Sequence, residues 1–210
     1  MTGNKSEIYK GFNLKSIREL IKNTATLYPN NLAYRYRKDP KDANTIDITY
    51  SIFYNDIANL DTSLLDLGLE GKKVVLIGPN RYEWCVSYMA ISLGNMTIVP
   101  LDYSLPPNEI ESLVIRSKAE AVIFDEKYMD TFVQIKNSGS SNLSHFICMD
   151  TKEDKDTILS YSKLIQKGKD LIDTGSTAHE DVKVDTSKVS VMLFTSRYDI
   201  YFQSCYADTR

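Results

Sequence analysis

Two hydroxyl side chains near the end of the chain have the pattern of a phosphate-binding segment. Thr195 and Ser196 directly follow Val189–Phe194, an apolar run typical of a buried strand. A strand that delivers hydroxyl groups to a loop is how such a segment begins, and exposed backbone N–H groups and glycine normally complete it. The nine positions from Tyr198 instead contain four aromatic residues and no glycine. The sequence therefore predicts the start of a nucleotide site at Thr195 and Ser196 without the loop that should follow.

The other polar candidates have structural explanations. Asn80 and Glu83 precede an apolar helical run with the spacing of an N-cap and its reciprocal glutamate. His145 and His179 have no Cys, His or carboxylate neighbours at ligand spacing, so we expect no metal site. Asp102 follows a predicted strand, where α/β proteins place ligands, but a turn explains it equally well. Neither a dinucleotide-binding glycine fingerprint nor a Walker motif is present in the sequence.

Composition indicates a soluble globular protein. The 210 residues are 42% apolar and 25% charged, and the net charge of −3 with no basic cluster argues against a nucleic-acid partner. The sequence has no apolar stretch long enough for a transmembrane segment and begins without the apolar run of a signal peptide. Three scattered cysteines form neither a disulfide framework nor a metal spacing (Cys85, Cys148 and Cys205). We therefore expect a cytoplasmic protein.

Strand-like and helix-like segments alternate along most of the chain. A helix over residues 14–28 and a hairpin over residues 32–50 come first, and an apolar stripe over residues 53–67 predicts a helix that ends at Gly68. Strands are then expected at residues 73–78, 97–100, 121–125, 145–149 and 189–196, and the segments between them include helices from Asn80, Pro107, Tyr128 and Ile158. Repeated strand–helix–strand units predict an α/β fold with a doubly wound, mostly parallel sheet and flanking helices.

Several short segments together resemble the N-terminal part of the adenylate-forming (AMP-binding) acyl-CoA synthetases, most closely the long-chain fatty acid–CoA ligases. The segments occur in the family's order, at residues 28–33, 48–50, 67–69, 74–84, 94–102, 121–125, 185 and 189–196. The resemblance implies the N-terminal portion of that family's large domain. In the family, the strand ending in Phe-Thr-Ser runs into a Gly-Thr-Thr-Gly loop that holds the phosphates of ATP. Thr195 and Ser196 match its opening, and Arg197 stands in place of the first glycine.

The resemblance also implies an activity. The full-length relatives use ATP and Mg²⁺ to activate a fatty acid as an acyl-adenylate, and then transfer the acyl group to coenzyme A. In those relatives the acyl pocket and the C-terminal domain with its catalytic lysine come after the stretch matched here. This chain therefore supplies only the start of the phosphate site, with no catalytic residue, no metal ligand and no tightly bound cofactor expected. We expect it to be inactive alone.

The genetic code offers an explanation for residues 197–210. If Arg197 is encoded by AGG, reading one nucleotide out of frame gives glycine. Permitted codons for the remaining residues then give Gly-Thr-Thr-Ser-Ile-Ser-Lys-Ala-Val-Met-Leu-Thr-His, which resembles the family's phosphate loop. We therefore expect an N-terminal extension over residues 1–13, an incomplete AMP-binding domain over residues 14–196, and an aberrant, frame-shifted tail over residues 197–210.

Two alternatives remain open. The chain could be a non-catalytic interaction module. It could also be the upstream half of a split enzyme, with a complementing chain that supplies the other half. An open final strand would leave backbone N–H and C=O groups for such a partner. It could also be part of an amino-acid adenylation domain, which differs in its substrate and acceptor.

Overall fold

The computed structural model describes residues 16–37, 39, 41–183, 185 and 187–194, and the backbone of residues 199–203. Thr195 and Ser196 therefore lie outside the described residues, as do the expected N-terminal extension and most of the expected tail. The elements, in order, are α1 (Ile17–Leu27), β1 (Leu32–Tyr36), β2 (Ile46–Thr49), α2 (Tyr50–Asp66), β3 (Lys73–Ile77), α3 (Tyr82–Leu93), β4 (Thr97–Pro100), α4 (Pro107–Ser117), β5 (Ala121–Phe124), the 3₁₀ turn η1 (Glu126–Tyr128), α5 (Met129–Ser138), β6 (His145–Cys148), β7 (Ile158–Ser160), α6 (Tyr161–Asp173), α7 (Ala178–Asp181), β8 (Val189–Phe194) and β9 (Asp199–Gln203).

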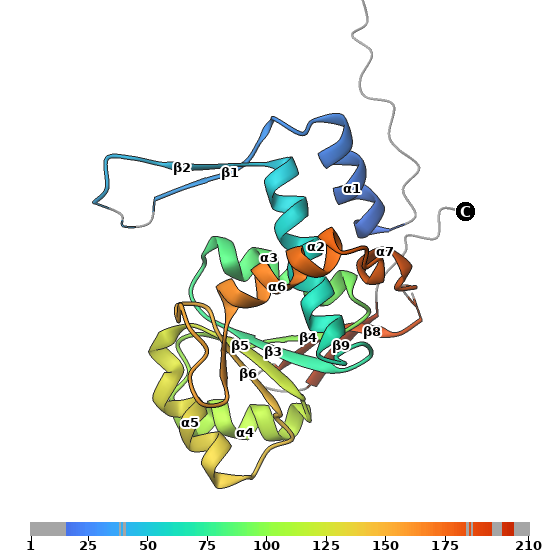
Figure 1. Ribbon diagram of the computed structural model, residues 1–210. Helices are drawn as coiled ribbons and strands as arrows, with labels where there is room; N and C mark the ends of the chain where they lie inside the picture. The colour runs from blue at the N-terminus through green and yellow to red at the C-terminus, as the bar shows by residue number, and fades with distance from the viewer. Residues whose placement is uncertain are drawn as a thin grey trace, which may run out of the picture.

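The centre of the molecule is one sheet in the order β7-β6-β5-β3-β4-β8-β9. Neighbouring strands from β7 to β8 run parallel, and β9 pairs antiparallel with β8. Strands β1 and β2 form a separate antiparallel hairpin that projects from the body, as Figure 1 shows. The predicted doubly wound, mostly parallel α/β fold is confirmed. The expected open edge at β8 was wrong for this structure, because β9 covers it.

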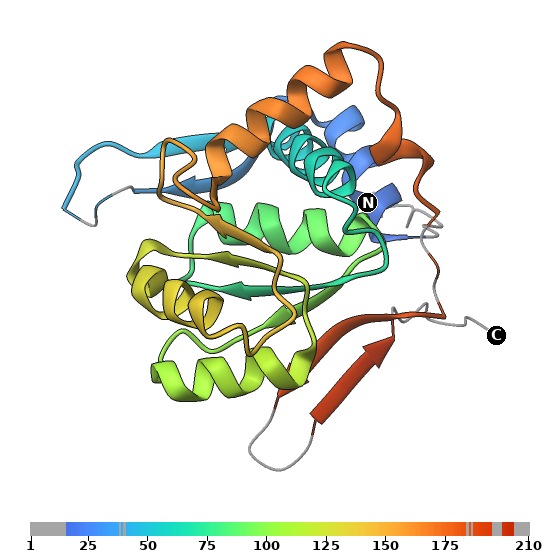
Figure 2. The same ribbon diagram turned by 60° about the horizontal axis from the view of Figure 1, so that its bottom comes forward.

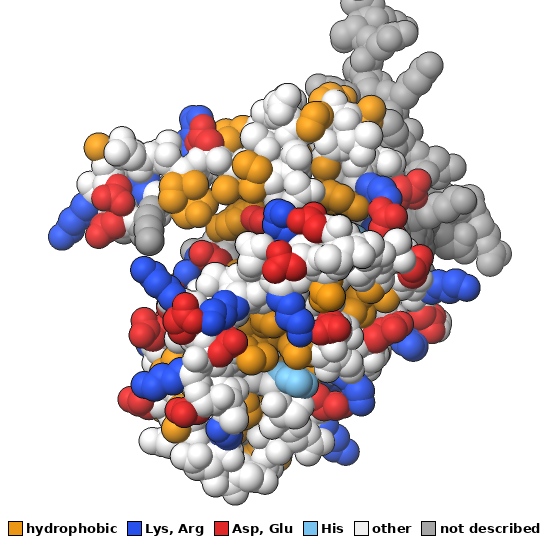
Figure 3. Space-filling model, viewed as in Figure 1, with side chains coloured by type: hydrophobic (Ala, Val, Ile, Leu, Met, Phe, Trp, Pro, Cys, Tyr) orange, Lys and Arg blue, Asp and Glu red, His pale blue; other side chains and the backbone are white. Residues whose placement is uncertain are grey.

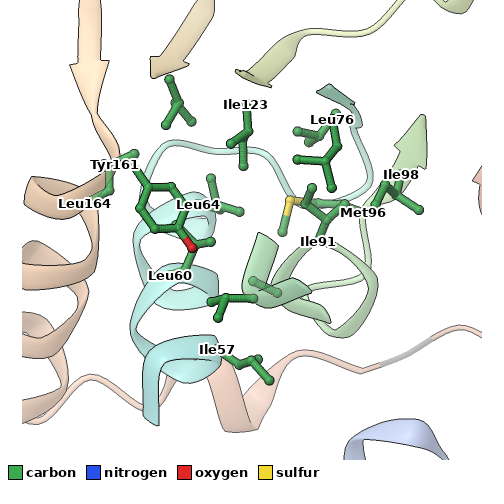
Figure 4. Close-up of a cluster of buried hydrophobic side chains, with 14 of the residues drawn as sticks. Ile57, Leu60, Leu64, Leu76, Ile91, Met96, Ile98, Ile123, Tyr161 and Leu164 are labelled. Carbon is green, nitrogen blue, oxygen red and sulfur yellow. The ribbon is translucent and has the colours of Figure 1, made fainter. Parts of the chain in front are cut away.

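Helices cover both faces of the sheet (Figure 2). Because alternate side chains of a strand point to opposite faces, Val74 and Leu76 of β3 pack beneath α2, α3 and α6, while Val75 and Ile77 pack against α4 and α5. Figure 4 shows the first of these cores, in which side chains of α2, α3 and α6 meet those of β3, β4 and β5. All residues of β3 except Lys73 are buried, as expected for a strand covered on both faces.

Local signals in the sequence account for several helix boundaries. The side chain of Thr49 accepts a hydrogen bond from the Ile52 N–H at the start of α2, and Pro107 occupies the first turn of α4. Gly68, just after α2, has a φ of 76°, the left-handed conformation that ends helices. The capping prediction for Asn80 was wrong: Arg81 is the N-cap residue of α3, and its side chain forms ion pairs instead of capping the helix.

The region expected as one helix from Ile158 is divided into two elements. Residues Ile158–Ser160 form β7, which pairs with β6, and α6 begins only at Tyr161. The Ser160 side chain accepts a hydrogen bond from the Lys163 N–H, so this residue caps the helix where the strand ends.

The surface carries charges of both signs without a large single-sign patch on the face in Figure 3, where apolar side chains gather beside the hairpin. In the part of the chain that the structure describes, no helix is both long and apolar enough to cross a membrane.

Candidate nucleotide-binding site

The predicted site residues follow β8, one of six parallel strands, β7, β6, β5, β3, β4 and β8, whose carboxyl ends lie at the same edge of the sheet. Ile98 of β4 is paired with Val191 of β8, so the exits of these strands are adjacent. Thr195 and Ser196 come directly after Phe194, the last residue of β8. The Phe194 ring lies 5.2 Å from the guanidinium carbon of Arg116 on α4. This edge is where open α/β sheets bind their ligands.

A topological switch point lies between β3 and β5 at this edge. The chain leaves β3 through α3 toward β4, on one side, and leaves β5 through α5 toward β6, on the other. Connections that diverge in this way create a crevice at the carboxyl ends of the strands. In this structure ionised side chains fill that position.

Arg81 is the centre of this ion cluster. Its Nη1 donates to Asp125 Oδ2 at 2.9 Å and to Asp150 Oδ1 at 2.7 Å, and its Nε donates to Glu83 Oε2 at 2.8 Å. Asp125 follows β5 and Asp150 follows β6, so the guanidinium links the exits of three strands. Burial lowers the pKa of Arg81, but hydrogen bonds to Glu83 and Asp150 outweigh it and raise the pKa overall. Arg81 is therefore engaged by three carboxylates in this structure.

We expect Arg81→Leu to lower the free energy of unfolding by about 2 kcal/mol, because three partly buried carboxylates would lose their shared cation. Denaturant unfolding measures this loss. The matched control is Arg35→Leu, which removes a 2.6 Å ion pair with Asp47 on the hairpin, where both side chains are about half exposed. That control should cost less than about 1 kcal/mol. Equal losses in the two variants would contradict a structural role for the Arg81 cluster.

Asp102, after β4, is engaged in a turn. Its Oδ1 accepts hydrogen bonds from the backbone N–H and the hydroxyl of Ser104, both at 2.8 Å. The backbone hydrogen bond and the hydroxyl bond lower the pKa of Asp102. Of the two interpretations left open by the sequence, the structure supports the turn.

The remaining candidates do not converge on this edge. His145 begins β6, Cys85 is half-buried in α3, and His179 is buried beside α2. Among the described residues no group of three or more His, Cys, Asp or Glu side chains could hold a metal ion. Three cavities of about 380 to 530 Å³ lie instead around α2 and α6, away from the ends of β3, β4 and β8.

Sequence reasoning missed the Arg81 cluster. The available signal was position: Asp125 ends one predicted strand and Asp150 directly follows the next, at the edge that Arg81 also reaches. Parallel strands bring such residues together. The capping pattern at Asn80 and Glu83 explained this segment equally well, so no role was predicted for Arg81.

Comparisons with known proteins agree with this architecture. Residues 21–196 match the family model of AMP-binding enzymes. The 4-hydroxybutyrate–CoA ligase 2 of Metallosphaera sedula is 27% identical over 90 residues, which cover 42% of this chain and 16% of the relative. The mitochondrial medium-chain acyl-CoA ligase of Danio rerio is 24% identical over 191 residues, which cover 82% of this chain and 29% of the relative. The chain thus spans less than a third of the length of these curated relatives.

Among solved structures, a long-chain-fatty-acid–CoA ligase from Archaeoglobus fulgidus has the same fold. It superposes with a TM-score of 0.73 at 15% identity, over 90% of this chain and 36% of that one. The family match covers most of the chain and ends at Ser196, the second of the two predicted site residues. The chain therefore belongs to the family of AMP-binding enzymes, as its resemblance to adenylate-forming acyl-CoA synthetases predicted.

Proposed function

We propose that this chain forms the first part of the adenylating domain of an ATP-dependent acyl-CoA synthetase. The observation that carries the proposal is the family match over residues 21–196, which runs to the Thr195–Ser196 pair after β8. The curated relatives named above are CoA ligases for a hydroxybutyrate and for medium-chain acids, which supports a carboxylic acid and coenzyme A as substrates. The similarity to a long-chain ligase fold is consistent with a fatty acid.

The proposed reaction has two steps. A carboxylate oxygen attacks the α-phosphorus of ATP, forming the acyl-adenylate as the bond between the α-phosphorus and the bridging oxygen to the β-phosphate breaks and pyrophosphate leaves. The thiolate of coenzyme A then attacks the acyl carbon and AMP leaves, while the thiol proton passes to solvent. Donors aimed at the phosphates would stabilise the charge that develops on them.

In this proposal the hydroxyls of Thr195 and Ser196 bind phosphate oxygens at the exit of β8. ATP is expected to bind as its Mg²⁺ complex. The described residues provide no cluster of metal ligands, and Asp125 and Asp150 are paired with Arg81, so they do not fit a resident Mg²⁺ and no step is assigned to it. Two hydroxyl side chains cannot replace a glycine-rich loop.

We further propose that a complementing chain, or a product read in the other frame past Thr195, supplies the remaining parts. A cytoplasmic location is also proposed. Cys85 and Cys148 are free thiols, which is consistent with a reducing compartment.

The 210-residue chain is expected to release no pyrophosphate above the blank from ATP, Mg²⁺, coenzyme A and acids from acetate to palmitate. Coding DNA read one nucleotide out of frame after Ser196 should encode the Gly-Thr-Thr-Ser loop and the rest of the enzyme. That longer product should catalyse ATP–pyrophosphate exchange that depends on a carboxylic acid, and Thr195→Ala in it should slow the exchange.

Either of two results would refute the proposal: pyrophosphate release by the 210-residue chain, or codons that cannot give the loop in the other frame. Exchange that depends on amino acids instead of fatty acids would favour the adenylation domains of peptide assembly.

A further inference from the structure

A buried polar cluster joins four helical elements on the side of the molecule away from the Arg81 cluster. Asp61 of α2 is fully buried, His179 of α7 is 4% exposed, and the His179 Nδ1 and Asp61 Oδ2 atoms are 2.5 Å apart. Arg18 of α1 donates from Nη1 to the carbonyl of Val182 at 2.6 Å, and from Nη2 to the carbonyl of Leu93 at the end of α3. Outside it, Lys22 pairs with Glu180 at 2.6 Å, and the Tyr54 ring lies edge-on to His179.

Burying the charged groups of this cluster costs free energy, which their contacts with one another must offset. Burial raises the pKa of Asp61, against the hydrogen bond from His179 and the charges of His179 and Arg18. The second carboxylate oxygen, Oδ1, has no hydrogen-bond partner and lies against Gly94, where an added Cβ would come within 2.1 Å of it. A carboxylate without its partner would be strongly unfavourable here.

The cluster holds the segment that leads into the strand of the candidate site. Helix α7 ends at Asp181, Arg18 holds the carbonyl of Val182, and β8 begins only seven residues later, at Val189. Among the described residues, β8 pairs with β4 at one register position, Ile98 with Val191, whereas β3 pairs with β5 at four. The hydroxyl of Thr97 adds one hydrogen bond, to the carbonyl of Val189.

We propose that Asp61, His179 and Arg18 are positioning residues that fix the segment entering β8, and with it the strand that leads to Thr195 and Ser196. The consequence for phosphate binding rests on the proposed function, whereas the anchoring itself does not. The position of a strand near the edge of a sheet depends in part on the segment that leads into it, and this cluster ties that segment to α1, α2 and α3 at once.

Two substitutions at His179 separate anchoring from packing. The side-chain nitrogen of asparagine is as many bonds from Cα as Nδ1 of histidine, so His179→Asn keeps a donor for Asp61. Glutamine places its nitrogen where Nε2 lies, so His179→Gln loses that donor. His145→Gln, on the half-buried first residue of β6, is the matched control for the change of residue type.

Hydrogen exchange of the 210-residue chain, followed by mass spectrometry, tests the proposal. In His179→Gln we expect amides of residues 182–194 to exchange about tenfold faster, with residues 121–148 unchanged, and we expect near-natural rates in His179→Asn. Arg18→Lys, which keeps the charge but not both carbonyl contacts, should give a smaller increase in the same segment. If His179→Gln does not fold, the test is the exchange of Arg18→Lys: faster exchange confined to residues 182–194 supports the proposal, and unchanged exchange there overturns it.

Uniformly faster exchange in every segment, or equal rates in the Asn and Gln variants, would overturn the proposal. Because exchange is measured without substrate, this failure is distinct from a failure of the proposed ligase function, which the pyrophosphate assays measure.

Discussion

Gly168→Ala is expected to lower the free energy of unfolding by about 3 kcal/mol, although alanine normally stabilises a helix relative to glycine by roughly 0.5–1 kcal/mol. Gly168 lies in α6 where this helix crosses α2. An added Cβ would lie 1.7 Å from the carbonyl oxygen of Asn59 and 2.5 Å from its carbon, and both are backbone atoms that cannot rotate away. The hydroxyl of Ser63 donates to the carbonyl of Leu164 at 2.5 Å, which holds the helices together at the same crossing. The two helices must therefore separate.

Thermal unfolding measures the effect, and a chain of this length should lose roughly 6–12 °C in its midpoint for 3 kcal/mol. Gln166→Ala is the matched control, because Gln166 is exposed on the same helix and makes a hydrogen bond only to Asp170 among the contacts described. The control should change the free energy of unfolding by less than about 0.5 kcal/mol. A Gly168→Ala variant as stable as the natural chain would show that α2 and α6 do not pack this closely.

The sheet could be predicted from the sequence because its signals are local. Lys73–Ile77 and Ala121–Phe124 are apolar runs with helical segments between them, and a strand buried on both faces needs no other information. Pro107 and Gly68 mark helix boundaries by their own backbone preferences. The assignment of Thr195 and Ser196 to the start of a phosphate segment also rests on a local signal, the strand directly before them, and it stays a prediction because both residues lie outside the described part of the chain.

The features that the sequence did not reveal depend on residues far apart in the chain. His179 lies in a polar stretch and reads as exposed, yet it is buried because Asp61, 118 residues earlier, pairs with it. The close approach at Gly168 depends on Asn59 in another helix. The Arg81 cluster unites the exits of three strands, and only the strand order brings them together. The division at Ser160 was missed because β7 pairs with β6, which periodicity within one segment cannot show.

Phe132→Ala should destabilise the opposite face of the sheet by about 3–5 kcal/mol. Phe132 is fully buried on α5, and its ring centroid lies 4.7 Å from that of Phe124 at the end of β5. Truncation would leave a cavity against β5, the strand that Asp125 follows. Both the packing of α5 and the position of Asp125, which accepts a hydrogen bond from Arg81, therefore depend on this ring.

Val133→Ala is the control for Phe132→Ala, because Val133 is the next residue of α5 and is 36% exposed. Denaturant unfolding of the two variants should differ by at least about 2 kcal/mol, since only Phe132 is enclosed by the core. Similar losses would mean that α5 is not docked as described. If Arg81→Leu lowers the free energy of unfolding by less in the Phe132→Ala background than in the natural chain, the ion cluster and the core are coupled through β5. Phe132 contacts Phe124 and Arg81 binds Asp125, and residues that share a network need not act additively. If the losses of the two single variants add up to that of the double variant, the Arg81 cluster is stable independently of the core around Phe132.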